Sequence, residues 1–361
     1  MTLEALREQI DGVDNAMLKL LNQRMDFVKQ VGDLKKSSNA IIYRPEREKA
    51  IIDRLVNLNT GKLLNRAAID AIFLEIFAVA RNIELPERIA YLGPEGSFTH
   101  QAAESRFGAM SDYTSLPTIK SVFEEVETQR AKFGVVPIEN NQEGIVNETI
   151  DLLHSSNLNI AAEIVNNIHF CFATQTESLD QITHIYTKDI AFRQCKRFLD
   201  AHFDGLKAEL IPVESTSKAA KLAAMNPKAA AICSHIAAKL FEVPVLFNNI
   251  QDNQQNRTRF LIIAKDFQNQ RSEEDKTTMI VNLQDSDKPG SLVHFLKEFD
   301  QRKINLIKLE SRPVKLSENF NFWFFVEFEG NFYDQLVQDA IAATTADVRC
   351  LGSYVKIISS S

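Results

Sequence analysis

The sequence predicts a multidomain protein with an all-α N-terminal block, an α/β middle part and a small α+β domain at the C-terminal end. Its 361 residues exceed the usual content of one domain, because domains cluster at about one to two hundred residues. The N-terminal block has few glycines and carries apolar residues at helical spacing. From Ile89 onward, short strand-like runs alternate with helical patterns, which is typical of α/β proteins.

The N-terminal block, 1–86, is predicted to contain three helices. Apolar residues recur three or four positions apart over roughly 2–36, so one long helix is expected there. Arg44-Pro45 begins a second helix, because proline suits the first turn, and a third helix runs over about 65–83. The first helix is longer than its partners. We therefore expect its apolar seam to be covered in a helical dimer.

The middle part, 88–267, contains the alternating pattern, and the last part, 276–361, has its own order of elements. The predicted strands of the middle part are 89–92, 133–137, 168–173, 182–186, 229–233 and 260–264. A polar, charged stretch from Lys265 to Lys276 is predicted to be a linker that few contacts cross. The last part has the order βαββαβ, which is typical of a ferredoxin-like domain.

Composition excludes several classes of function. The net charge of −7 argues against a general nucleic-acid binder. No apolar run approaches the ~18 residues of a membrane-spanning helix, and the N-terminus has no signal-peptide pattern. The four cysteines are far apart and are expected to be reduced thiols of a cytoplasmic protein. The seven histidines lack ligand spacing, so no metal site is expected.

Charged residues interrupt the apolar seams of the N-terminal helices. Arg24 is the one charged position on the seam of the first helix, and Lys35 emerges on nearly the same side. Glu48, with Arg47 beside it, and Glu84 stand on the seams of the other two helices. Each charge alone is readily explained as a snorkelling side chain or a register-setting contact. Together, three cations and two carboxylates predict a pocket for a small polyanion.

Residues 1–85 resemble the all-helical chorismate mutases. The resemblance lies in Leu6-Arg7-Glu8-Gln9-Ile10-Asp11, in Val31-Gly32-Asp33-Leu34-Lys35 and in Tyr43-Arg44-Pro45-Glu46-Arg47-Glu48. It implies a pericyclic rearrangement of the dicarboxylate chorismate to prephenate, which needs no nucleophile and no cofactor. Catalysis then consists of holding the compact conformer and stabilising charge on the breaking ether oxygen.

The resemblance also implies roles for single residues. Arg24 and Arg47 bind carboxylates, Lys35 donates to the ether oxygen, and Glu48 holds the ring hydroxyl. Arg7 is about 100° around the helix from Arg24. In the family the matching arginine reaches into the partner's site, which requires a dimer.

Two positions depart from the family pattern. Glu84 stands where some members have Gln, and Ala80 stands where some have Ser. An ether oxygen only accepts hydrogen bonds, so Glu84 helps only when it is protonated. We therefore expect mutase activity to fall as the pH rises.

Residues 89–265 resemble prephenate dehydratase. The resemblance lies, in order, in Tyr91-Leu92-Gly93-Pro94-Glu95-Gly96-Ser97-Phe98-Thr99, in Val136-Pro137-Ile138-Glu139-Asn140 followed by Glu143-Gly144, and in Thr258-Arg259-Phe260. It implies two lobes like those of a periplasmic binding protein, with the site in the cleft. Prephenate must lose its ring hydroxyl and CO₂ to become aromatic, so the protein protonates the leaving hydroxyl and holds both carboxylates.

Thr258 matches the family's essential threonine and is expected to assist departure of the hydroxyl. Arg259 is expected either to bind a substrate carboxylate or to form a salt bridge between the lobes. The other positions that match the family's cleft are Glu139, Asn140, Thr187, Gln194 and Phe260. Asn141 replaces the usual serine, and Tyr186-Thr187-Lys188-Asp189 replaces the more familiar Tyr-Ser-His-Pro.

Residues 277–361 resemble an ACT regulatory domain. The resemblance lies in Asp287-Lys288-Pro289-Gly290-Ser291-Leu292-Val293 and in Glu310-Ser311-Arg312-Pro313. These segments form a phenylalanine site between paired domains in this family, which assigns effector binding to Pro289, Gly290, Ser291, Leu292, Glu310, Ser311 and Arg312. The alternative is a plain dimerisation domain.

The three resemblances occur in the order found in the bifunctional chorismate mutase–prephenate dehydratases. They imply a cytoplasmic homodimer or higher homo-oligomer that converts chorismate to phenylpyruvate under feedback inhibition by L-phenylalanine. One alternative is a non-catalytic amino-acid-sensing binding protein. Another is a mutase whose dehydratase is weak or prefers arogenate.

Overall fold

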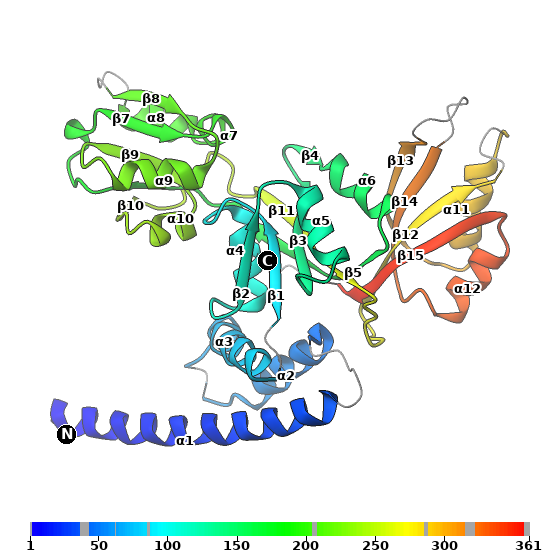
Figure 1. Cartoon of the computed structure of the whole chain (residues 1–361), viewed down its shortest axis with the longest axis horizontal. Helices are drawn as coiled ribbons and strands as arrows, with labels where there is room; N and C mark the ends of the chain where they lie inside the picture. The colour runs from blue at the N-terminus through cyan, green and yellow to red at the C-terminus, as the bar shows by residue number, and fades with distance from the viewer. Residues whose placement is uncertain are drawn as a thin grey trace. The chain divides into compact units, whose positions relative to one another are not determined.

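The structure is a computed structural model. It describes residues 2–36, 43–61, 63–84, 87–203, 208–284, 288–314 and 322–356, without the side chains of 35 and 36. The chain forms two compact units, of which the first comprises Met1–Glu87 with Phe107–Asp112 and the second comprises the remainder. Figure 1 shows the elements of each unit. No helix within these described ranges has the length and apolarity needed to cross a membrane.

The first unit is built on the three expected helices. They are α1 (Leu3–Lys36), α2 (Pro45–Leu58) and α3 (Arg66–Glu84). Proline occupies the first turn of α2, and Ile52, Ile69 and Phe77 form the small core between α2 and α3. The apolar seam of α1 stays in solvent, with Leu20 64% and Phe27 58% exposed. The two shorter helices, α2 and α3, cannot cover a seam of this length.

The first lobe of the second unit has a mixed sheet in the order β2-β1-β3-β11-β5, with β4 paired to β3. Strand β11 runs antiparallel to both β3 and β5. Its elements are β1 (Arg88–Leu92), α4 (Phe98–Phe107), β2 (Asp112–Leu116), α5 (Ile119–Glu127), β3 (Phe133–Asn140), β4 (Gly144–Ile145), α6 (Asn147–Ser155), β5 (Leu158–Asn167) and β11 (Arg257–Lys265).

The second lobe has a separate sheet in the order β10-β6-β9-β7-β8. The chain enters this lobe after β5 and returns to the first lobe at β11, so two crossings join the lobes. Its elements are β6 (Cys171–Thr174), η1 (Leu179–Gln181), β7 (His184–Thr187), α7 (Asp189–Gln194), α8 (Lys196–Phe203), β8 (Glu209–Pro212), α9 (Thr216–Ala224), β9 (Ala229–Cys233), α10 (His235–Leu240) and β10 (Val245–Phe247).

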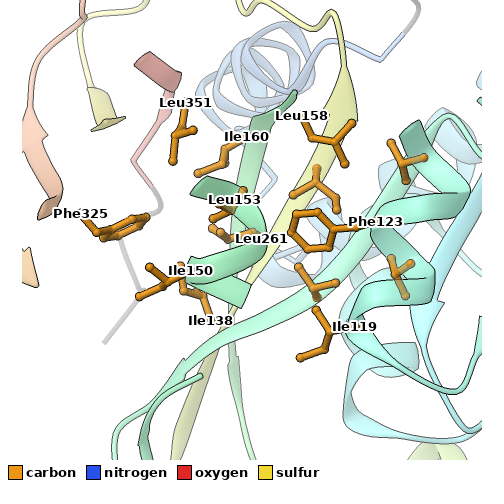
Figure 2. Packing of buried hydrophobic residues seen from close by; sticks show 14 of the residues in the cluster. Ile119, Phe123, Ile138, Ile150, Leu153, Leu158, Ile160, Leu261, Phe325 and Leu351 are labelled. Carbon is orange, nitrogen blue, oxygen red and sulfur yellow. The ribbon is translucent and has the colours of Figure 1, made fainter. Parts of the chain in front are cut away.

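The C-terminal part has the βαββαβ order and an antiparallel sheet ordered β13-β14-β12-β15. Its elements are β12 (Asp275–Leu283), α11 (Ser291–Gln301), β13 (Leu306–Pro313), β14 (Phe322–Glu329), α12 (Gln335–Ala342) and β15 (Ala346–Val355). One apolar core lies between this sheet and its two helices. The other face of the sheet shares a core with the first lobe, where Phe325 and Leu351 lie near Ile150 and Leu153 (Figure 2).

This shared core corrects the prediction that few contacts cross the stretch Lys265–Lys276. Asn269 in this stretch donates hydrogen bonds to the backbone oxygens of Ala161, at 2.8 Å, and Ser353, at 2.9 Å. Lys276 is buried. The polar composition was misleading because these polar groups are hydrogen-bonded or ion-paired inside the protein.

Candidate active sites

Arg24 lies between α1 and α3, as its place on the seam predicts. Its guanidinium carbon is 5.7 Å from the centre of the Phe77 ring. Its Nη1 is buried and has no hydrogen-bond partner among the residues described. Burial lowers the pKa of Arg24, while nearby Glu84 favours the charged form and Arg47 opposes it. A half-buried cation with an unpaired N–H fits an anionic ligand.

Glu48 forms an ion pair that the sequence analysis missed. Its partner is Arg81 of α3, whose second nitrogen donates to the carbonyl oxygen of Phe107 at 2.9 Å. The guanidinium of Arg81 lies 5.7 Å from the ring centres of Tyr43 and Phe107. Arg81 follows Phe77 by four residues on the α3 seam. Arg81 therefore interrupts the apolar seam of α3 in the same way as Glu84.

The remaining mutase candidates have different surroundings. The side chains of Arg7 and Arg47 are exposed, and that of Lys35 lies outside the described structure. Gly32 lets α1 approach α3 closely, since a Cβ at this position would lie 3.1 Å from the Cα of Glu84. Arg47 and Glu84 both lie close enough to Arg24 to affect its pKa, so the structure brings these three side chains near one another.

Thr258 and Asn140 are directly opposite each other on β11 and β3. The Asn140 Nδ2 lies 2.8 Å from the Thr258 Oγ1. The Oδ1 of the same amide accepts the backbone N–H groups of Gln142, at 2.9 Å, and Glu143, at 3.0 Å. These two bonds fix the orientation of the amide, so that its NH₂ group faces Thr258.

The Thr258 hydroxyl has one hydrogen bond within the described part of the chain. It accepts a hydrogen bond from Asn140 and donates none to any residue in the described part of the chain. A hydroxyl has one proton to donate. The proton of Thr258 is therefore available to a substrate.

The network continues into the second lobe through Asn256, a buried residue to which the sequence assigned no role in the site. Its Oδ1 accepts from Asn140 Nδ2 at 3.0 Å, and its Nδ2 donates to the Oε1 of Gln194 at 2.9 Å. Thr187, by contrast, is buried and donates to the carbonyl oxygen of Lys188 at 3.2 Å. Gln194 thus joins the network, whereas the Thr187 hydroxyl bonds to backbone.

The glycine-rich turn joins the two lobes. The Ser234 Oγ of the second lobe donates to the backbone oxygen of Gly96 at 2.8 Å, and Ser217 donates to that of Glu95. Gly96 has a φ of +79°, and a Cβ there would lie 3.2 Å from the Cα of Ala237. Glycine is therefore needed at this turn for both conformation and space. Neither serine was predicted. Ser234 is the N-cap of α10 and Ser217 lies in the first turn of α9, and serine is common at both kinds of position.

Arg259 does not join the Thr258 network. Its guanidinium forms ion pairs with Glu139 at 2.8 Å, Glu163 at 3.0 Å and Glu327 of the C-terminal sheet at 2.8 Å. Burial alone would lower the pKa of Arg259, but the carboxylates of Glu327 and Glu163 raise it above its ordinary value. Arg259 thus forms ion pairs, but they do not join the two lobes: two partners lie in the first lobe itself and the third lies in the C-terminal sheet. Phe260 is buried in the core.

The effector candidates lie at two places in the C-terminal part. Gly290, with a φ of +92°, immediately precedes α11, and Ser291 donates to the backbone oxygen of Lys288 at 3.0 Å. Pro289 is exposed and Leu292 is half-buried. On β13, Glu310 is half-buried and Ser311 is exposed. Arg312 contacts α6 of the first lobe instead of facing solvent.

The charged residues around Arg24 and the Thr258–Asn140 network lie in different units of one chain, as expected for an enzyme with two separate sites. The family model described as chorismate mutase type II matches residues 6–85, and that of prephenate dehydratase matches residues 89–268. A bifunctional chorismate mutase/prephenate dehydratase from Aquifex aeolicus is 38% identical, over 99% of this chain and 98% of its own. Its counterpart from Pseudomonas aeruginosa is 35% identical, over 99% and 98%.

One solved structure extends the comparison. The prephenate dehydratase from Arthrobacter aurescens in complex with L-Phe aligns with a TM-score of 0.66 at 31% identity, covering 74% of this chain and 90% of that one. This chain belongs to the bifunctional chorismate mutase/prephenate dehydratase family. It rearranges chorismate to prephenate, and it dehydrates and decarboxylates prephenate to phenylpyruvate.

Proposed function

We propose that Thr258 is the proton donor of the dehydratase and that Asn140 orients it. The Thr258 O–H protonates the ring hydroxyl of prephenate, which leaves as water. The bond to the ring carboxyl group breaks, CO₂ departs, and its electron pair completes the aromatic ring. Thr258 then recovers its proton from solvent. The observation that carries this proposal is the fixed Asn140 amide, which donates to Thr258 and leaves its proton free.

The proposal is tested by Asn140→Asp in the full chain. A carboxylate at this position only accepts hydrogen bonds, so it would take the Thr258 proton away from the substrate. We expect the dehydratase kcat to fall about 10²-fold or more, in the range of general-acid catalysis. Mutase activity of the same chain is the internal control. A dehydratase kcat within about twofold of wild type, with prephenate as substrate, would overturn the role of Asn140.

For the mutase, we propose that Arg24 and Arg47 bind the substrate carboxylates and that Lys35 and Glu84 face the ether oxygen. The buried, unpaired N–H of Arg24 supports this assignment. Glu48 is assigned to the ring hydroxyl while it is held by Arg81. Because no substrate atom becomes covalently bound, these residues act by orientation and charge.

We further propose that the protein is a homodimer or higher homo-oligomer, in which the exposed α1 seam is covered by a second copy. Leu3, Ile10, Val13, Met17, Leu20 and Phe27 are each half or more exposed. Burying one such side chain stabilises an assembly by about 1.5–3 kcal/mol. Arg7, exposed on the same helix, would then enter the partner's mutase site.

The proposed domains are the mutase at 1–86, the dehydratase at 88–267 and an ACT regulatory domain at 276–361. The βαββαβ order supports the last of these. The relative whose structure holds L-Phe supports L-phenylalanine as the allosteric inhibitor. We assign its binding to Pro289, Gly290, Ser291, Leu292, Glu310, Ser311 and Arg312. The free cysteines suit the reducing cytoplasm.

A further inference from the structure

A six-charge cluster lies between the first lobe and the C-terminal sheet. It consists of Glu139, Glu163 and Arg259 from the lobe, and of Lys276, Lys308 and Glu327 from the sheet. The lobe supplies one cation and two carboxylates, whereas the sheet supplies two cations and one carboxylate. The cluster is therefore neutral only when both halves are present.

The cluster lies on the opposite face of the sheet from the Thr258–Asn140 pair. In the β3–β11 register, Thr258 is opposite Asn140, and Arg259 is opposite Glu139. Successive side chains of a strand point to opposite faces. The Thr258–Asn140 pair therefore occupies one face of the sheet, while Arg259 and Glu139 hold the same backbone from the other face.

Strand β13 contacts this arrangement at two points. The Lys308 Nζ is 2.7 Å from the same Glu139 oxygen that Arg259 contacts at 2.8 Å. Four residues later, Arg312 donates to the Oδ1 of Asp151 and to the Oδ1 of Asn147, both at 2.8 Å. Asp151 and Asn147 belong to α6, which follows the loop whose N–H groups orient Asn140. One strand thus holds both Glu139 and α6.

The C-terminal sheet also binds the other end of α6. Arg349 donates to the backbone oxygen of Ser156 at 2.9 Å and also to that of Leu153. The His154 ring stacks on Trp323 with 4.3 Å between ring centres. Trp323 is the single tryptophan of the chain, so its fluorescence reports on the contact between α6 and this sheet.

We propose that Lys308 is a positioning residue of the dehydratase site. It acts through Glu139 on the strand that carries Asn140. Together with Arg312, it connects β13 to the Thr258–Asn140 pair. Glu310 and Ser311 of β13 belong to the proposed phenylalanine site, so an effector that shifts this strand alters dehydration. The positioning role is independent of that site, whereas the regulatory role rests on the proposed function.

The test compares Lys308→Met, Lys308→Arg and the control Lys297→Met in the full-length protein. Lys297 is exposed on α11 of the same domain, so its replacement removes one positive charge without touching the cluster. Both activities are measured without phenylalanine, and phenylalanine is then titrated against the dehydratase rate and the Trp323 fluorescence.

We expect Lys308→Met to lower the dehydratase kcat about tenfold, because catalysis is sensitive to small displacements of its groups. The KM for prephenate stays within about twofold, since Lys308 is not placed at the substrate, and mutase activity is unchanged. Lys308→Arg restores kcat, and Lys297→Met equals wild type. In Lys308→Met, phenylalanine still changes the fluorescence but inhibits less than in wild type.

Two results would overturn the positioning role. One is a dehydratase kcat in Lys308→Met equal to that in Lys297→Met. The other is a proportional loss of both activities, which would indicate a general structural defect. If wild type itself does not respond to phenylalanine, the proposed effector site and the regulatory role both fall. The phenylalanine-free kcat still decides the positioning role in that case.

Discussion

Replacing Glu327 by glutamine removes one negative charge from the six-charge cluster while keeping the shape of the side chain. The Glu327 carboxylate is buried and lies 2.8 Å from Arg259 and 3.3 Å from Lys276. The variant retains three cations but only two carboxylates, Glu139 and Glu163. A positive charge is then left uncompensated between two sheets.

The free energy of unfolding falls because this uncompensated charge stays removed from water. Removing one partner of a buried ion pair destabilises a protein by about 3–5 kcal/mol. Because Glu163 still contacts both cations, we expect the lower end, about 3 kcal/mol. For a unit of this size that corresponds to a fall in Tm of roughly 6–12 °C.

The control is Glu329→Gln on the same strand. Glu329 pairs with Lys356 at the surface, where an ion pair contributes less than about 1 kcal/mol. Thermal unfolding of both variants is followed by the fluorescence of Trp323, which is buried in β14. If Glu327→Gln unfolds at the same temperature as Glu329→Gln, the cluster does not contribute the stability inferred from its burial.

The loss of stability at low pH is a second measurement on the same variant. Burial alone would raise the pKa of Glu327, but Lys276 and Arg259 together hold it below its ordinary value. The unfolded chain, whose glutamates titrate at about 4.3, then takes up protons first as the pH falls. The Glu327 contribution is complete above that pH and is lost as the pH falls through the folded pKa. Wild type should therefore lose more stability in acid than Glu327→Gln.

Three further predictions concern the mutase and the C-terminal part. Arg24→Met should lower the mutase kcat/KM about 10²-fold, as loss of a charge-stabilising group does, while prephenate turnover persists; an unchanged mutase would refute the pocket. Glu84→Gln should retain or increase the mutase kcat/KM, because glutamine supplies an N–H donor to the ether oxygen whereas a carboxylate only accepts, and a large loss of mutase activity would contradict this. A chain ending before Lys276 should keep mutase activity, but calorimetry should show its dehydratase lobe unfolding at lower temperature because the shared core is uncovered; an unchanged transition would argue against that core.

Local patterns predicted much of the fold. The spacing of apolar residues over 2–36 anticipates α1, which spans Leu3–Lys36, because helix periodicity is a property of neighbouring residues. The motifs around Asn140 and Thr258 anticipate a shared location, and the structure pairs them across two strands. For the helix the information lies within the segment itself, whereas the shared location of Asn140 and Thr258, 118 residues apart, came from the family resemblance.

Long-range partners were not predictable in this way. Nothing near Arg259 in the sequence indicates that its carboxylate partner is Glu327, 68 residues later. Strand alternation does place Arg259 and Thr258 on opposite faces, so the separate network of Arg259 was open to prediction. The stretch Lys265–Lys276 was misjudged because polar composition does not reveal whether side chains are solvated or paired inside the protein.

Replacing Thr258 by alanine tests the separation of the two activities most directly. Both activities are assayed on one purified full-length variant, whose fold is checked by circular dichroism. The Thr258 hydroxyl is the proposed proton donor, so dehydratase activity should fall about 10³-fold while mutase activity stays within about twofold. Equal loss of both activities in a folded protein would contradict two independent sites.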